Sequence, residues 1–106
     1  MDVRNLQDLR LFSAEKMAKN SLFSTPRMYY DLYCLEPGQA QKVHSHAGSD
    51  KVYLVLDGKV HATVGTEERE LGPSEAVLCP AGAPHGVTNR STERVTLLVV
   101  TTPPPV

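Results

Sequence analysis

From Pro26 onward the chain alternates between short apolar runs and clusters of turn-forming residues. Valine, leucine and tyrosine fill the runs, and glycine, proline, aspartate or asparagine stands between most of them. Short apolar segments at close, regular spacing are typical of an all-β sandwich or barrel. The expected strands are, in chain order, 27–35, 39–46, 51–56, 59–64, 69–71, 75–79, 85–89 and 93–102.

Two of the turns predict β-hairpins. Asp57-Gly58 stands between the strands 51–56 and 59–64, and Asp-Gly between two apolar runs is a strong hairpin signal. The polar run 65–68, which begins with Gly65, predicts a second hairpin to the short strand that follows it.

The first 25 residues do not follow this rhythm. Leu6, Leu9 and Leu11 predict a short extended edge, and Ser13 is a typical helix N-cap. We therefore expect one or two helical turns from Ser13 to about residue 18. The apolar positions of this arm favour packing on the barrel or on a second subunit over disorder. They are Leu9, Leu11, Phe12, Met17, Leu22 and Phe23.

This pattern divides the chain into an N-terminal arm (1–25), a β-barrel (26–102) and a proline-rich tail (103–106). Proline lacks the N–H that a sheet ladder needs, so the tail is expected to leave the barrel as polyproline II. The strands 52–56 and 95–100 are apolar on both faces. Because one face lines the barrel interior, the arm or another subunit must cover the other, which predicts a homodimer.

Composition narrows the classes of function. The chain has 106 residues, which suits one domain. Its net charge is −1 with scattered Lys and Arg, so nothing indicates a nucleic-acid partner. No apolar run is long enough to span a bilayer, and no signal peptide is visible. Cys34 and Cys79 lack CxxC spacing and are expected to be reduced core residues of a cytoplasmic protein.

Three histidines carry the candidate chemistry. His44 and His46 stand two residues apart on an expected strand, so their side chains share one face. His85 follows the rigid turn 80–84. Imidazole is the commonest protein ligand for Zn, Fe, Cu and Ni, whereas carboxylates favour harder ions such as Mn. Three nitrogens would leave open positions on a divalent metal ion, as catalytic metal sites do.

These residues resemble the two motifs of the cupin superfamily. The residues that carry the first motif are Gly38, His44, His46 and Gly58, and those of the second are Gly72, Pro80, Gly82, His85 and Asn89. The resemblance implies a small single-domain cupin with a double-stranded β-helix, or jelly-roll, barrel. It also implies metal binding by the histidines and points to a homodimer.

One position departs from the family pattern. Cupins usually add a glutamate ligand after the second histidine, and Lys51 stands at that position here, with Asp50 one residue earlier. Strand alternation allows only one of the two to face the interior. In one arrangement Asp50 joins the three histidines as a ligand; in the other the site is three-histidine only, with Lys51 nearby. An inward Lys51 would need a lowered pKa or a head group swung outward.

Other residues have secondary roles. Lys51, Tyr53 and Tyr33 are candidate ligand-binding residues, because lysine and tyrosine supply hydrogen-bond donors. Counting back from His44 by twos places Gln41 on the opposite face of its strand. Outside the two motifs, His61 is expected not to bind metal.

The function expected from these features is binding of a divalent metal and a small polar organic molecule in a barrel pocket. As an enzyme the protein would be a metal-dependent dioxygenase or isomerase. The alternative is a non-enzymatic module, with or without a metal, that binds or senses a small molecule, and Lys51 favours it. The fold does not choose between them, since one fold hosts many functions. A third interpretation is a structural dimerisation module with a side-chain-filled barrel.

Overall fold

The computed structural model describes residues 1–106, and nearly all of the regular structure is β. A single 3-10 turn, η1 (Leu6–Leu9), precedes nine strands. They are β1 (Ala18–Thr25), β2 (Met28–Leu35), β3 (Ala40–His44), β4 (Asp50–Asp57), β5 (Val60–Val64), β6 (Glu67–Leu71), β7 (Ala76–Cys79), β8 (His85–Thr88) and β9 (Val95–Thr102).

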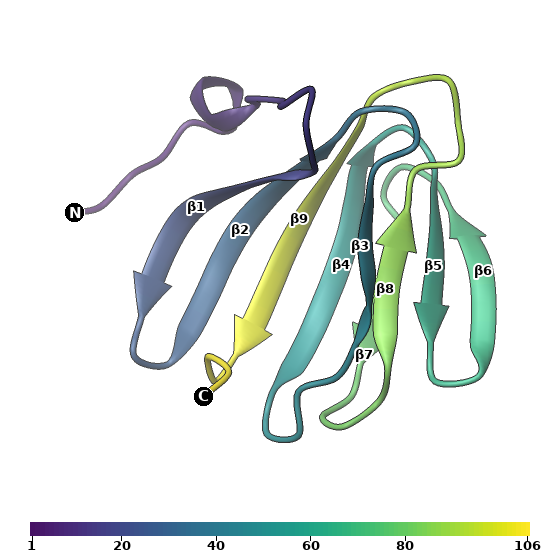
Figure 1. Cartoon of the computed structure of the whole chain (residues 1–106). Coiled ribbons are helices and arrows are strands. Elements are labelled where there is room, and N and C mark those ends of the chain that lie inside the picture. The colour runs from purple at the N-terminus through teal and green to yellow at the C-terminus, as the bar shows by residue number, and fades with distance from the viewer.

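The strands form two antiparallel sheets that face each other (Figure 1). One sheet has the order β1-β2-β9-β4-β7 and the other β3-β8-β5-β6. This arrangement confirms the expected all-β jelly-roll fold. Each of the eight expected strands is present, and their ends differ from the expectation by a few residues at most.

The N-terminal region differs from its prediction in two places. The helical turn lies at Leu6–Leu9, where Asn5 caps it by accepting a hydrogen bond from the Gln7 N–H, and the residues after Ser13 are not helical. The extended edge predicted at 6–11 is therefore wrong. Ala18–Thr25 is instead an edge strand that pairs with β2. A helix of one or two turns is marginal in water, and here the chain bends at residues 14–16, where Ser13 Oγ accepts a hydrogen bond from the Glu15 N–H.

The Asp57-Gly58 turn is not a hairpin, because β4 and β5 belong to different sheets. It carries the chain from one sheet to the other. Gly58 has a φ of +80°, and a Cβ there would lie 2.6 Å from the Arg94 carbonyl oxygen. The turn thus needs glycine for its conformation and for a close approach to another segment. The hairpin predicted at Gly65 does form, between β5 and β6, with Val64 opposite Glu67.

Buried apolar side chains fill most of the space between the sheets. The largest are Tyr33 and Tyr53, and aliphatic residues of β4, β5, β8 and β9 surround them. A second, smaller cluster lies on the outer face of the five-stranded sheet, where Leu6, Leu9 and Phe12 pack on Leu22 and Leu32. The N-terminal residues thus cover part of the face whose apolar character the sequence indicated.

The uncovered part of that outer face stays partly apolar. Val52, Leu54 and Val100 are half-buried, and Leu78 on β7 is 57% exposed. Cys34 and Cys79 are free and buried in separate clusters, with no disulfide between them. No helix of the structure has the length and apolar character that crossing a membrane requires.

Candidate metal centre

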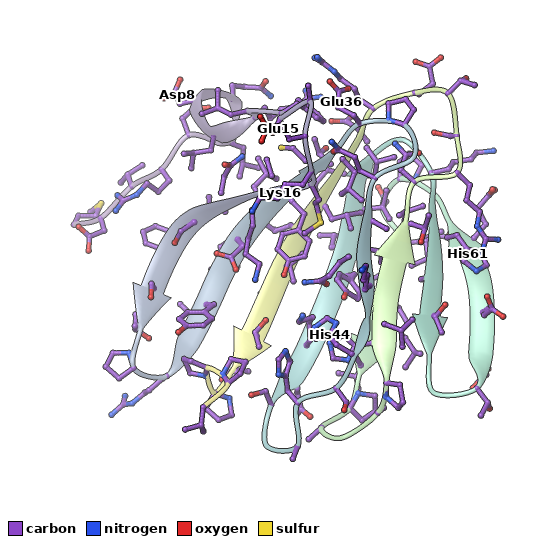
Figure 2. All side chains as sticks on the ribbon, viewed as in Figure 1. Asp8, Glu15, Lys16, Glu36, His44 and His61 are labelled. Carbon is purple, nitrogen blue, oxygen red and sulfur yellow. The ribbon has the colours of Figure 1, made fainter.

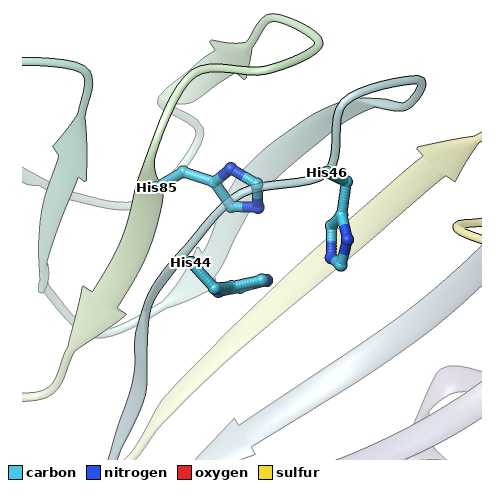
Figure 3. A group of neighbouring side chains, drawn as sticks. All are labelled: His44, His46 and His85. Carbon is cyan, nitrogen blue, oxygen red and sulfur yellow. The ribbon is translucent and has the colours of Figure 1, made fainter.

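Antiparallel pairing of β3 with β8 brings the two histidine motifs together. His44 at the end of β3 stands directly opposite His85 at the start of β8, and His46 follows two residues after His44. The ring centroid of His44 lies 4.4 Å from that of His85 and 4.8 Å from that of His46. One candidate ligand nitrogen from each histidine lies within 4.8 Å of the other two (Figure 3).

Backbone carbonyls orient two of the three rings. His44 Nδ1 lies 2.7 Å from the Lys42 carbonyl oxygen, and His85 Nδ1 lies 2.9 Å from the Ala83 carbonyl oxygen. A ring nitrogen facing a carbonyl carries the hydrogen, so Nε2 keeps its lone pair. This is the arrangement that fixes the tautomer of metal-binding histidines.

The Nε2 atom of His85 is buried and has no hydrogen-bond partner. Burying an acceptor without a partner is unfavourable, so this nitrogen is suited to bind a metal ion or a hydrogen-bond donor. Burial lowers the pKa of His46 and of His85, and the neighbouring Lys51 and His44 charges lower both further. Neutral imidazole is the form that binds metal, so the donor set fits a divalent transition-metal ion.

Lys51 is the residue of the Asp50-Lys51 pair that faces the histidines. Its side chain projects from β4 and is only 3% exposed, with Nζ 3.4 Å from His44 Nε2. The ammonium also lies 5.6 Å from the centroid of the Tyr53 ring. Burial, followed by the charge of Lys19, lowers the pKa of Lys51 to about 8.

The structure does not bring Asp50, the expected fourth ligand, to the three histidines. Regular alternation along β4 turns it to the exposed side, where its Oδ1 accepts a hydrogen bond from the Ala81 N–H at 2.8 Å. Asp50 thereby holds the turn that precedes His85. The geometry matches the other arrangement, three histidines with Lys51 beside them.

Tyr53 borders the histidines, and Tyr33 reaches the same region through a glutamine. The Tyr53 ring centroid lies 6.2 Å from that of His85. Tyr53 donates to Gln41 Oε1 at 2.5 Å, and Gln41 Nε2 donates to Tyr33 Oη at 3.2 Å. Burial raises the pKa of Tyr33 to about 12, so its hydroxyl stays protonated.

The prediction that Gln41 faces away from the histidines is wrong. A β-bulge between Gln41 and His44 places three residue steps of β3 opposite two of β8, which changes the alternation. Gly86 permits the close approach, since a Cβ there would lie 2.7 Å from the Gln41 carbonyl oxygen. Strand counting along β3 could not reveal the bulge; a glycine on the partner strand is the one signal that accompanies it.

A hollow of about 280 Å³ lies beside His46. His46 and the loop 45–49 form one wall, and the tail 103–106 forms the other. Ser49 Oγ donates to the Pro103 carbonyl oxygen at 2.6 Å and ties the tail to this loop. The hollow therefore reaches one of the three histidines, and His44 and His85 do not line it.

His61 lies apart from this group, as expected. It projects from β5, where its Nε2 is 2.7 Å from Glu68 Oε1. Figure 2 shows it on the far side of the four-stranded sheet, well separated from His44. Asn89 fixes a turn by donating to the Leu35 and Glu93 carbonyl oxygens.

Similar solved structures support the architecture. A crystal structure of TT1209 from Thermus thermophilus is 55% identical, with a TM-score of 0.96, over 99% of this chain and 100% of that chain. An uncharacterised double-stranded β-helix protein from Klebsiella pneumoniae is 17% identical, with a TM-score of 0.89, over 97% and 90% of the two chains.

A third similar structure has a name that includes an activity. It is a sugar phosphate isomerase of the cupin superfamily from Silicibacter pomeroyi, 29% identical with a TM-score of 0.67. The match covers 72% of this chain and 50% of that chain.

Comparison with curated proteins returned no match. The family description "Cupin domain" matches residues 31–101, well over half of the sequence. The chain therefore belongs to the cupin superfamily.

Proposed function

We propose that this cupin binds one divalent transition-metal ion, such as Fe, Mn, Ni, Zn or Cu, through His44, His46 and His85. The observation that carries the proposal is the buried, unpartnered Nε2 of His85. It lies beside two further imidazole nitrogens, and a backbone carbonyl holds its ring in the tautomer that a metal requires.

We further propose that the site takes a small polar organic molecule through the hollow beside His46. When bound, the metal would act as a Lewis acid that polarises an oxygen of the ligand. Tyr53 is fully buried beside His85, and its hydrogen bond to Gln41 keeps its ring in place next to the histidines.

Isomerisation is the reaction we propose to test first. Two similar structures, one from Silicibacter pomeroyi and one from Acidithiobacillus ferrooxidans, have names that include sugar phosphate isomerase. Their identities are 29% and 26%, and this chain covers half or little more than half of each. Dioxygenase chemistry is the other enzymatic class, and oxygen uptake during the same assays separates the two.

The competing function is a metal-free module that binds or senses a small molecule. Lys51 favours it, because an ammonium 3.4 Å from His44 Nε2 occupies space beside a ligand nitrogen and repels a metal cation. Elemental analysis of tag-free protein, as isolated and after reconstitution, distinguishes the two functions.

We expect about one equivalent of metal in the unmodified protein and a loss of metal in His44→Ala and in His85→Ala. His61→Ala is the matched control, since His61 lies outside the group, and it should keep its metal. Circular dichroism shows whether each variant is folded. Folded wild-type protein without metal, even after reconstitution, would overturn the metal-binding proposal and leave the metal-free module.

A homodimer that works in the cytoplasm completes the proposal. The uncovered apolar part of the outer face, which includes Val52, Leu54 and Leu78, supports a second copy of the chain as its cover. The two free, buried cysteines favour a reducing compartment. Light scattering after gel filtration tests the dimer, and Leu78→Lys should shift the protein to monomer.

A further inference from the structure

Lys51 places a buried positive charge beside the three histidines. Lys51 is 3% exposed, and its Nζ contacts His44 Nε2 and the face of the Tyr53 ring. None of the ion pairs in the structure includes Lys51. A buried charge without a counter-charge is costly, so this ammonium is suited to receive an anion.

The groups around Lys51 form no ion pair with it. Its neighbours across the sheet are Cys79 on β7 and Thr101 on β9. Asp31 on β2 is buried on the same side of the sheet, and its field reaches Lys51 without forming an ion pair with it. Lys19 on β1 adds a second positive charge whose field also reaches Lys51, so two ammonium groups face one carboxylate. The polar end of the barrel therefore has an excess of positive charge before any metal binds.

A metal ion on His44 Nε2 would add two positive charges next to the Lys51 ammonium, which lies 3.4 Å from that nitrogen. On the basis of the proposed metal site, we propose that Lys51 forms an anion subsite beside the metal and that the ligand is a small carboxylate. One carboxylate oxygen would accept hydrogen bonds from Lys51, and the other would face the metal.

A carboxylate suits the subsite better than a phosphate. The positive group here is one ammonium, a point charge with three donors. Phosphate sites in proteins commonly use the fork of an arginine or the N–H groups at a helix N-terminus. Lys51 instead contacts His44 and Tyr53, and Cys79 lies opposite it on β7. A planar group with two oxygens can satisfy the ammonium and a metal at once.

The consequence is a coupling between metal and anion. Without an anion, the Lys51 ammonium and the metal repel each other across His44, so the ammonium lowers the affinity of the site for the metal. With a carboxylate between them, metal binding strengthens, and by reciprocity the metal strengthens carboxylate binding by the same factor.

The test measures Co²⁺ affinity of metal-free protein by calorimetric titration, with acetate, with its neutral isostere acetamide, or with inorganic phosphate at matched ionic strength. We expect acetate to tighten Co²⁺ binding about tenfold and acetamide to leave it unchanged. Lys51→Met should bind Co²⁺ more tightly than wild type without acetate and respond to acetate by less than about twofold. Lys59→Met removes an exposed lysine far from the site and should behave as wild type.

Several outcomes would overturn the proposal. Co²⁺ binding that acetate does not change in wild type, or a response that persists in Lys51→Met, removes the role of the ammonium. A larger effect of phosphate than of acetate excludes a carboxylate as the preferred ligand. Absence of Co²⁺ binding under every condition refutes the metal site itself, and this inference with it. If Lys51→Met does not fold, Lys51→Gln replaces it in the titrations. The comparison of acetate with acetamide on wild type then tests the role of the anionic charge.

Discussion

The two ends of the space between the sheets are built from opposite kinds of residue. At one end Leu35 on β2 lies opposite Val95 on β9, Val55 on β4 lies opposite Leu97 on β9, and all four are fully buried. At the other end the same three strands present Asp31, Lys51 and Thr101, and β3 and β8 add His44 and His85. Along β2 and along β4, a buried tyrosine stands between the aliphatic layer and the titratable one.

This contrast separates stability from chemistry within one small barrel. The aliphatic end contributes the area removed from water, which is the main favourable term in folding. The polar end keeps an unpartnered imidazole nitrogen and an unpaired ammonium, both of which oppose folding. Groups that a protein buries at a cost are candidates for binding, because a ligand can satisfy them.

The largest effect on stability should come from the aliphatic layer. Leu97 on β9 is fully buried, and Leu97→Ala should lower the free energy of unfolding by about 2–5 kcal/mol through lost burial and a new cavity. Metal bound per folded molecule should not change. Urea denaturation and elemental analysis measure the two quantities, and a loss of metal from folded Leu97→Ala would show that the two ends are not independent.

A smaller effect is expected where the two ends meet. Gln41→Leu should cost about 1–3 kcal/mol, because it leaves the buried hydroxyls of Tyr53 and Tyr33 without partners. Combining it with Tyr33→Phe and Tyr53→Phe should cost less than the sum of the separate changes. Thermal denaturation of this series checks the prediction, and full additivity would mean that Gln41 does not bridge the tyrosines.

The pH dependence of stability tests the edge of the polar end. Burial raises the pKa of the Cys79 thiol from 9.0 to about 11, so the folded state holds its proton more tightly than the unfolded state does. The stabilisation is complete below pH 9 and is lost as pH rises through 11, by about 1–3 kcal/mol. Subtracting the profile of Cys79→Ala isolates this loss from that of the tyrosines. Parallel profiles for the two proteins would show that Cys79 is not protected.

The smallest effect is expected on the outer side of β4. In Asp50→Asn the side-chain oxygen still accepts from the Ala81 N–H, so stability should fall by less than about 1 kcal/mol. Metal affinity should stay within about threefold of wild type, because a residue that only fixes a turn does not ligate the ion. A tenfold or larger loss of metal affinity would place Asp50 in the metal site after all.

Much of the molecule could be predicted from local sequence. Apolar runs between turn residues located eight of the nine strands, and the two histidine motifs located the group that β3 and β8 assemble. β1 was missed because Ala18–Thr25 has few apolar residues, and its pairing with β2 is what makes it a strand. The Gly58 turn was wrongly predicted because a hairpin and a crossing between sheets both need a glycine with positive φ.

The sequence by itself determined the fold class and the three histidines, because strand periodicity and motif spacing are local properties of a chain. Only the tertiary structure decided that Lys51 and not Asp50 faces them, since alternation makes the two exclusive without saying which side is inside. Only the pairing of β3 with β8 revealed the bulge that turns Gln41 inward. In both cases the deciding contact joins residues distant in sequence, and packing against a partner strand, not the strand's own pattern, sets it.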